Sequence, residues 1–257
     1  MKITVLVENT CASASVGCEH GLSLFIETNG RNILFDMGQT ELFAANAEML
    51  GIDLASVDFA VLSHGHYDHG GGLGKFLDIN GKAPVYMSRY AFMPHYNGTE
   101  KYIGLDVRLC ENPRIIFTDD KFGIDSGIML MSAAEDITGK FTDAGLTLFE
   151  GGAFAGEDFR HEQYLEINEN GRKVLFSGCS HRGITNIVKQ FCPDVLVGGF
   201  HLSKMNDEDE LREYARFLDG YDTDYYTCHC TGENQYYFLK QYMKRLEYIR
   251  TGDVIIL

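Results

Sequence analysis

The stretch of sequence that decides the fold is FAVLSHGHYDHGGG, residues 59–72. Its first four residues are apolar and predict a buried strand, and the loop that follows carries His64, His66, Asp68 and His69. Neutral imidazole and carboxylate groups are the ordinary ligands of zinc, iron and manganese. Three of the nine histidines of the chain fall in this loop. The loop therefore predicts a metal site, and we expect the glycines after it to leave room for backbone close to an ion.

The loop matches the H-x-H-x-D-H signature of the metallo-β-lactamase superfamily, and three further motifs carry the same resemblance. Asp36 ends an apolar strand, as in the superfamily's first motif. Cys179 and His181, in the run LFSGCSH, lie where the superfamily has a strand that ends in a metal ligand. His229, in the run YTCHCTG, resembles the last ligand motif. The match covers residues 1–80 and 160–257.

Within the superfamily, the chain is most similar to a branch of metal-dependent hydrolases that resemble 7,8-dihydropterin-6-methyl-4-(β-D-ribofuranosyl)aminobenzene-5'-phosphate synthase. Members of this branch carry similar Gly-Cys-Ser-His, Gly-Gly-Phe-His-Leu and His-Cys-Thr-Gly runs. The resemblance implies an αββα sandwich, in which two facing mixed sheets are flanked by helices. We expect one domain over residues 1–257, with a family-variable region that covers the active site at about 85–160.

The spacing of apolar residues by itself predicts a mixed α/β fold. A strand–loop–helix unit recurs three times in the second half of the chain, and each strand ends in a loop that bears a histidine. Active sites collect at the ends of strands in such folds. The predicted strands are 3–7, 22–27, 32–35, 59–62, 114–118, 127–131, 173–177, 195–197 and 225–228, and the predicted helices are 42–50, 184–191, 207–218 and 233–246.

Composition restricts the partners of the protein. The chain has 257 residues and a formal net charge of −15, and this negative field repels phosphate backbones. Nucleic acid is therefore excluded as a substrate, and no segment is long and apolar enough to predict a membrane span. Seven cysteines, an odd number without framework spacing, predict a reducing compartment, the cytoplasm. A small-molecule substrate is expected, and the oligomeric state, including a homo-oligomer, stays open.

The resemblance also implies how the ligands are shared. His64 and His66 bind one ion, Asp68 and His69 bind its neighbour, and a water or hydroxide lies between the two. Two ions, zinc in preference to iron or manganese, bind on either side of a water molecule and activate it. His181 and His229 are the first candidates for the remaining ligands, against the alternative of helix-capping or indirect roles. Cys179 stands where many relatives have a bridging aspartate, so that its thiolate is a further candidate ligand.

The other histidines and the cysteines receive more local interpretations. His201 is expected to contact substrate or to donate to an oxygen in the transition state, rather than to bind metal. His161 is either a gate or an indirect donor to the site, or a solvent-facing residue. His20 and His95 have no motif around them and receive no role. Asp36 is expected to accept the second N–H of a metal-bound imidazole or to hold the loop's backbone. Cys228 and Cys230 are interpreted as buried packing residues.

These residues predict a hydrolase with a dinuclear centre. A metal-bound hydroxide would attack a small-molecule ester or phosphoester, Asp68 would orient it or receive its proton, and His201 would stabilise the leaving oxygen. The alternatives are activity like that of the synthase, and a non-catalytic sensor that binds a metabolite through its metal. A di-iron protein that reduces oxygen or nitric oxide is a further class, but its flavin-bearing partner domain does not fit in 257 residues.

Overall fold

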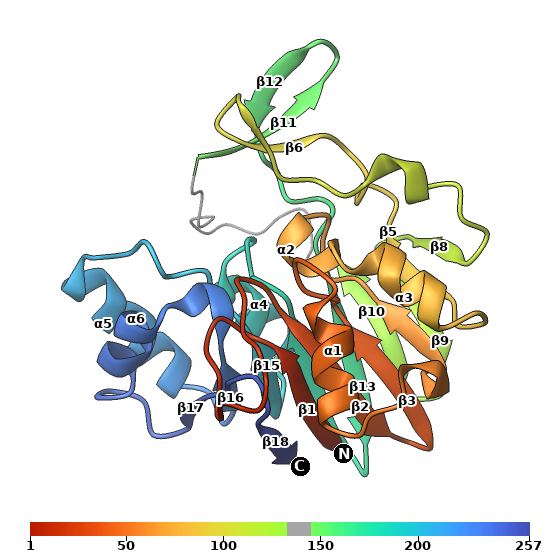
Figure 1. The fold of residues 1–257 in the computed structure, drawn as a ribbon. Helices are drawn as coiled ribbons and strands as arrows, with labels where there is room; N and C mark the ends of the chain where they lie inside the picture. The colour runs from red at the N-terminus through yellow and green to blue at the C-terminus, as the bar shows by residue number, and fades with distance from the viewer. Residues whose placement is uncertain (133–144) are drawn as a thin grey trace. The chain divides into compact units, whose positions relative to one another are not determined.

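The computed structural model describes residues 1–132 and 145–257, so the part of the predicted covering region over 133–144 lies outside the described residues (Figure 1). The chain divides into two units and passes between them several times. Unit 1 comprises Met1–Asp119, Gly145–Gln163 and Arg250–Leu257. Unit 2 comprises Asp120–Ala144, whose described part ends at Ser132, and Tyr164–Ile249. Both units combine a sheet with helices, which confirms the predicted mixed α/β class.

Unit 1 contains a seven-stranded sheet in the order β18-β1-β2-β3-β4-β5-β8. Neighbours from β18 to β3 are antiparallel, and those from β3 to β8 are parallel. Strands β2 and β3 form a hairpin, and Asn29 and Gly30 of its tight turn both have positive φ, of 50° and 72°. The strands are β1 (Lys2–Val7), β2 (Ser23–Thr28), β3 (Arg31–Phe35), β4 (Phe59–Val61), β5 (Val85–Ser88), β8 (Ile115–Thr118) and β18 (Val254–Ile256).

Helices cover one face of this sheet. The core between them joins Leu6 and Leu34 of the strands to Phe43 and Phe76 of the helices. Burying such apolar side chains is the main favourable contribution to folding. The helical segments of unit 1 are α1 (Leu42–Met49), η1 (Leu54–Ser56), α2 (Tyr67–Gly70), α3 (Leu73–Ile79) and η2 (Val107–Leu109).

A second, four-stranded sheet of unit 1 lies in the predicted covering region, in the order β12-β11-β6-β7. The sequence pattern did not predict it, because its strands are short and β12 is exposed along its whole length. The other strands of residues 85–132 belong to the seven-stranded sheets of the two units. The strands of the small sheet are β6 (His95–Asn97), β7 (Lys101–Tyr102), β11 (Leu146–Glu150) and β12 (Ala153–Gly156).

Unit 2 contains a seven-stranded sheet in the order β17-β16-β15-β14-β13-β10-β9. Its strands β14 to β17 are parallel, so that their carboxyl ends lie at one edge. Helices α4, α5 and α6 pack their apolar residues on the sheet around Leu196 and Tyr225. The elements are β9 (Lys121–Asp125), β10 (Ile128–Ser132), β13 (Gln163–Glu169), β14 (Arg172–Ser177), α4 (Ile184–Phe191), β15 (Val195–Gly198), α5 (Glu208–Asp219), β16 (Asp224–Thr227), η3 (His229–Thr231), α6 (Glu233–Leu239) and β17 (Leu246–Tyr248).

The prediction of one long helix over 233–246 was wrong at its end. Helix α6 ends at Leu239, and Leu246 begins strand β17, which pairs with Tyr225 of β16. Leu246 is fully buried in the core of unit 2, and the Lys240 amino group donates to its carbonyl. Burial in the sheet therefore overrides the helical spacing of this segment.

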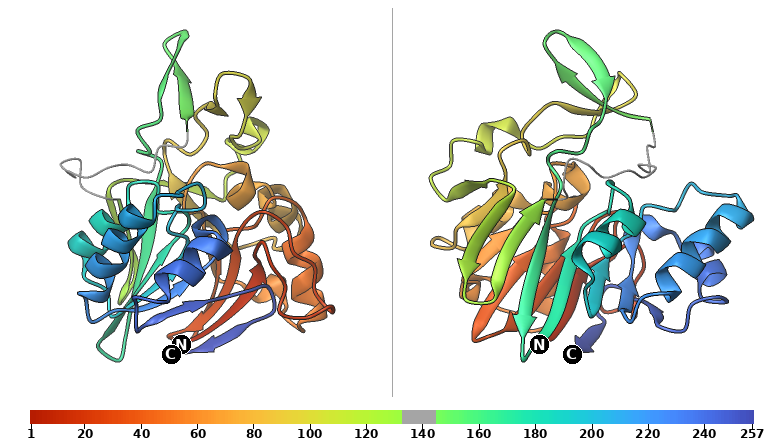
Figure 2. Two further views of the ribbon diagram at one scale, coloured as in Figure 1. Left: turned by 90° about the vertical axis from the view of Figure 1, so that its left-hand side faces the viewer. Right: turned by 180° about the vertical axis from the view of Figure 1, so that it is seen from behind.

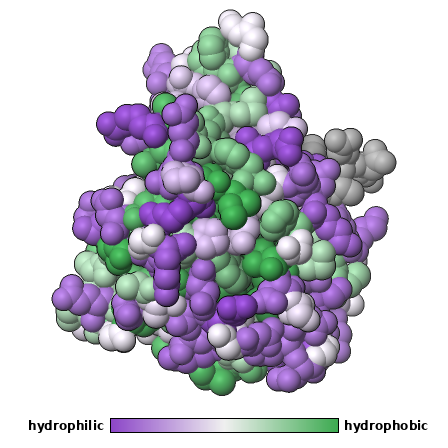
Figure 3. Space-filling model, turned by 90° about the vertical axis from the view of Figure 1, so that its right-hand side faces the viewer, coloured by the Kyte–Doolittle hydropathy of each residue, from purple (hydrophilic) through white to green (hydrophobic). Residues whose placement is uncertain are grey.

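Strand β1 is an interior strand of its sheet, because it pairs with β2 on one side and with β18 on the other. Leu257 N donates to Met1 O at 3.0 Å, and both views of Figure 2 show the two ends of the chain side by side. On the face drawn in Figure 3, hydrophilic residues are interspersed with hydrophobic ones. None of the helices in the described part of the chain has the length and apolar character needed to cross a bilayer.

Candidate metal centre

Asp36 braces the histidine loop, as the sequence predicts. It follows β3 in a left-handed backbone conformation with φ 57°, and it is fully buried. Its Oδ1 accepts the backbone N–H of Ser63 at 2.7 Å, and its Oδ2 accepts from Ser63 Oγ at 2.8 Å and His69 Nδ1 at 2.6 Å. The predicted hold of Asp36 on the backbone of the loop is confirmed, and Asp36 also accepts from the His69 ring. That this imidazole binds a metal ion stays a prediction.

This network determines which nitrogen of two histidines carries a proton. His69 donates through Nδ1–H, because a buried carboxylate accepts. Ser63 gives its single hydroxyl hydrogen to Asp36, so its Oγ accepts from His64 Nδ1–H at 2.8 Å. Coordination of a cation by either ring would therefore use Nε2. Rings held through the opposite nitrogen are typical of metal-binding histidines, so these residues fit a metal ion.

The imidazoles of the loop pack closely together. The His64 ring centroid lies 4.7 Å from that of His66 and 4.2 Å from that of His69. All three rings are buried. His64 thus lies against both of its neighbours, and the assignment of His64 with His66 to one ion and Asp68 with His69 to another stays a prediction.

The glycines after the loop are explained by contact with another backbone segment. A Cβ at Gly71 would lie 2.1 Å from the carbonyl oxygen of Gln39, and a Cβ at Gly72 would lie 2.3 Å from that of Met37. Met37 N also donates to His69 O at 2.7 Å. The room that these glycines provide is therefore used by residues 37–39, rather than by backbone around an ion.

His20, which received no role from the sequence, contacts Asp68. Its Nε2 lies 3.2 Å from Asp68 Oδ2, although 57% of the His20 side chain is exposed. The neighbouring Gly21 permits this approach, because a Cβ there would lie 2.4 Å from Asp68 O. A single glycine beside a histidine is not a distinctive signal, so sequence reasoning missed this contact.

A second buried cluster in unit 1 surrounds His66. It consists of His66, His95, Glu157 and His161, whose ligand atoms all lie within 4.8 Å of one another. His95 Nδ1 lies 2.8 Å from Glu157 Oε2, and the rings of His95 and His161 stack with centroids 4.1 Å apart. Sequence reasoning missed His95 and Glu157, because they come from distant segments of the covering region without a motif.

His161 is fully buried, so the solvent-facing alternative was wrong. The backbone N–H of Gly65 donates to His161 Nδ1 at 2.8 Å, and the neutral ring therefore carries its hydrogen on Nε2. That nitrogen lies 3.8 Å from Glu157 Oε1. His161 thus accepts from the histidine loop through one nitrogen and faces a carboxylate with the other, and its role as a gate or an indirect donor to the site stays a prediction.

Unit 2 gathers the remaining predicted residues at one edge of its sheet. Cys179 and His181 follow β14, His201 follows β15, and His229 follows β16. All are buried except the half-buried His201, whose ring centroid lies 4.2 Å from that of His181. Because these strands are adjacent and parallel, their histidine-bearing loops lie at one edge of the sheet.

Hydrogen bonds hold the three loops of this edge together. Gly199 N donates to Gly178 O at 3.0 Å, Ser180 Oγ donates to Gly199 O at 2.6 Å, and Phe200 N donates to Thr231 Oγ1 at 2.8 Å. Ser180, His201 and His229 have positive φ angles of 59°, 54° and 49°. Such left-handed conformations are uncommon in residues other than glycine and concentrate at functional sites. The edge is therefore a preorganised candidate site, and its union with the histidine loop in one centre stays a prediction.

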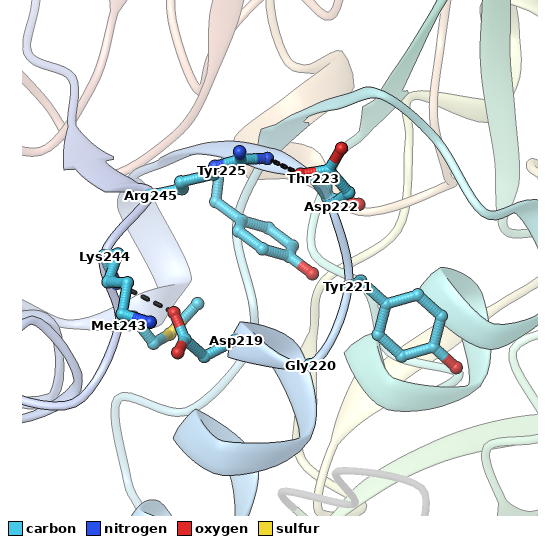
Figure 4. Close-up of a pocket in the computed structure, with 9 residues that line it drawn as sticks. All are labelled: Asp219, Gly220, Tyr221, Asp222, Thr223, Tyr225, Met243, Lys244 and Arg245. Atoms are coloured by element: carbon cyan, nitrogen blue, oxygen red, sulfur yellow. Dashed lines mark hydrogen bonds and ion pairs between the residues drawn. The ribbon is translucent and has the colours of Figure 1, made fainter.

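Unit 2 also has a cavity of about 280 Å³, which none of the predicted site residues line (Figure 4). Its polar groups pair with one another: Lys244 N donates to Asp219 Oδ1 at 2.9 Å, and Arg245 pairs with Asp222. The cavity therefore offers no sign of a metal or catalytic site. Its lining consists of Asp219, Gly220, Tyr221, Asp222, Thr223, Tyr225, Met243, Lys244 and Arg245.

Comparison with known proteins agrees with the motifs. Residues 16–227 match the family model of the metallo-beta-lactamase superfamily. Among solved structures, the chain is similar to Tm1679, a metal-dependent hydrolase of the beta-lactamase superfamily, with 29% identity, a TM-score of 0.88 and coverage of 100% of this chain and 99% of that one. The Zn²⁺-bound PqqB of Methylobacterium extorquens, 10% identical with a TM-score of 0.60 and coverage of 100% of both chains, shares the fold alone.

Two proteins of Methanocaldococcus jannaschii are similar over nearly their whole length. The uncharacterized protein MJ0448 is 29% identical over 98% of this chain and 99% of its own. A 7,8-dihydropterin-6-methyl-4-(beta-D-ribofuranosyl)-aminobenzene-5'-phosphate synthase is 28% identical over 99% of this chain and 96% of its own. The family match, the fold and the histidine motifs agree, and the chain belongs to the metallo-beta-lactamase superfamily.

Proposed function

We propose that the protein is a metal-dependent hydrolase, with a dinuclear centre, that acts on a small-molecule ester or phosphoester. The observation that carries the proposal is the bracing of His64 and His69 by Ser63 and Asp36, because it leaves Nε2 of both rings for a cation. The proposed ligands are His64, His66, Asp68, His69, Cys179, His181 and His229.

When bound, a pair of divalent ions supplies a Lewis acid and a water activated near neutral pH. The residues of the chain provide the surroundings for that chemistry. Asp68 is the proposed proton acceptor, and His20 is placed to fix the direction of its carboxylate at 3.2 Å. His201 is the proposed donor to the leaving oxygen. Imidazole and thiol ligands favour zinc over manganese or magnesium.

The proposed substrate is a small molecule in the cytoplasm. A net charge of −15 opposes binding of nucleic acid, and seven cysteines, an odd number without framework spacing, support a reducing compartment. Similarity to a solved metal-dependent hydrolase over the full chain supports the reaction class.

The test is metal analysis combined with a panel of phosphomonoester, phosphodiester, carboxylic ester and lactone substrates. We expect turnover that a chelator removes and added zinc restores, and we expect Asp68→Ala to abolish turnover while Asp78→Ala, on the exposed side of α3, preserves it. Turnover that resists both chelation and Asp68→Ala contradicts the proposal. Tight, metal-dependent ligand binding without turnover of any substrate would instead identify a sensor.

A second candidate activity is that of the synthase relative, which is 28% identical over 99% of the chain. It predicts formation of the product that the relative's name specifies, from a dihydropterin with a leaving group on its 6-methyl carbon and a ribofuranosyl-aminobenzene phosphate, whose amino nitrogen displaces that group and loses a proton. Product detected by mass spectrometry, together with an inactive hydrolase panel, would favour this candidate.

A further inference from the structure

Two thiols and one imidazole meet at the loop edge of unit 2. The sulfur atoms of Cys179 and Cys230 and a ring nitrogen of His201 all lie within 4.8 Å of one another. They come from the loops after β14, β15 and β16, which the hydrogen bonds described above hold together. Cys230 is therefore more than a buried packing residue. Nothing in the sequence distinguishes it from Cys228, which received the same interpretation.

The backbone makes room for this arrangement. A Cβ at Gly199 would lie 2.3 Å from Cys230 Sγ, so only glycine leaves space for the sulfur there. Cys230 Sγ is also 3.4 Å from the carbonyl oxygen of Cys179. Ser203 N donates to Cys230 O at 3.0 Å, which fixes the backbone from the other side. The thiol is thus held in position by three separate segments.

His201 offers a ring nitrogen to which a metal ion could bind. His201 Nδ1 is a buried atom without a hydrogen-bond partner among the described residues. A zinc ion within reach of both sulfur atoms would bind them as thiolates, because thiolates, rather than thiols, bind metal ions.

We propose that Cys179, His201 and Cys230 bind one zinc ion as a Cys₂His site. Two thiolates and one imidazole select a soft or borderline cation, and three protein ligands leave a fourth position open for water or substrate. The site goes beyond the proposed hydrolase centre, because all three of its ligands belong to unit 2 and only Cys179 is a proposed ligand of both. His201 would bind zinc here in place of its proposed role as donor to the leaving oxygen.

The experiment replaces the native metal of the full-length protein with cobalt(II) and records the near-ultraviolet thiolate-to-cobalt charge-transfer band. We expect the wild-type band to fall to about half in Cys179→Ser and in Cys230→Ser. It is expected to persist in Cys228→Ser, from the same loop, and in the exposed Cys192→Ser. His201→Ala is expected to keep the band and to weaken cobalt binding about tenfold or more. Circular dichroism checks that each variant folds.

A band that Cys179→Ser removes and Cys230→Ser leaves intact overturns the proposal, because Cys179 then binds without its neighbour. So does a Cys179–Cys230 disulfide in protein purified under reducing conditions. X-ray absorption of the zinc-loaded wild type needs no variant, and it should show two sulfur atoms at about 2.3 Å from one zinc. The hydrolase panel is measured on the same zinc-loaded wild type, so that two sulfur ligands on one zinc without turnover of any substrate mark failure of the proposed function alone.

Discussion

At the scale of single residues, Asp36 concentrates several roles in one carboxylate. It accepts three hydrogen bonds, from two groups of Ser63 and from the His69 ring, without any exposure to solvent. Losing a buried acceptor leaves its donors unpaired, which costs about 1–3 kcal/mol for each group. Asp36 therefore couples the stability of the loop to the orientation of its imidazoles.

We expect Asp36→Asn to destabilise the protein by about 1–3 kcal/mol, because the amide places a donor opposite donors. Metal affinity should fall about 10–100-fold, as it does when a partner of a metal-binding histidine is removed. Urea unfolding and competition with a chromophoric chelator measure the two effects. Asp58→Asn is the control, since Asp58 accepts only from Asn32 N, at 2.9 Å, among the described residues, and should leave metal affinity unchanged. Equal metal affinity in Asp36→Asn and wild type would argue against the brace.

Glu157→Gln tests the buried cluster around His66. Glutamine has nearly the same shape, but its amide can place a donor opposite His95 Nδ1–H, where the carboxylate accepts at 2.8 Å. We expect a loss of about 1–3 kcal/mol in the free energy of unfolding and a changed His95 ring nitrogen shift in NMR spectra. The exposed Glu150→Gln, which removes a surface pair with Arg160, should cost less than about 1 kcal/mol. Similar losses in both variants would contradict the structural importance of this cluster.

The local part of the site is predictable from sequence, because His64, His66, Asp68 and His69 fall within one loop. The roles of His95 and Glu157 were not predictable. They depend on a small sheet whose short strands show no clear alternation of apolar and polar residues, and 62 positions separate the two residues. Contacts between distant segments follow from tertiary packing rather than from spacing along the chain.

At the scale of elements, the close packing of the loops after β14, β15 and β16 gives a sharp prediction. Gly199→Ala would place a Cβ 2.3 Å from Cys230 Sγ, and we expect it to destabilise the protein by about 1–3 kcal/mol through overpacking. Gly123→Ala in β9 is the matched control, since nothing lies within 4 Å of its Cβ position. Thermal unfolding compares the two variants. Equal midpoints would show that the loops shift to accommodate the added methyl group without loss of stability.

Most elements were predictable where two signals agree. Helix α1 has apolar residues at helical spacing, and Gly51 with φ 71° follows its end. The prediction failed over 233–246, where helical spacing continues but Leu246 is needed in the sheet core. Whether a buried residue such as Leu246 belongs to a helix or to a parallel strand depends on pairing with β16. That strand is too far away along the chain for a local pattern of apolar residues to include it.

At the scale of the whole molecule, bound metal should stabilise the fold by mass action. At a free zinc concentration one hundred times the dissociation constant, the gain is about 2.7 kcal/mol. We expect chelation to lower the midpoint of thermal unfolding for wild type and for Asp78→Ala, and to lower it less for His64→Ala, which lacks one ligand of the proposed centre. An unfolding midpoint of the wild type that does not respond to chelator or to added zinc would count against a resident metal.

The charge of the whole chain gives a separate prediction. With a net charge of −15, the protein should not raise the fluorescence anisotropy of labelled single-stranded DNA or RNA, even at low salt, where electrostatic attraction is strongest. A basic DNA-binding protein serves as the positive control. Binding that weakens steeply with added salt would reveal a basic surface and would revive a nucleic-acid substrate.

The pairing of β18 with β1 has a consequence for biosynthesis. On the ribosome, β1 is made first, whereas β18 is made after the whole of unit 2. Until then β1 presents an open row of backbone donors and acceptors, which is the kind of edge that recruits foreign strands. A nascent chain that stalls before residue 254 would carry this open edge, so removal of the last four residues should promote aggregation during expression.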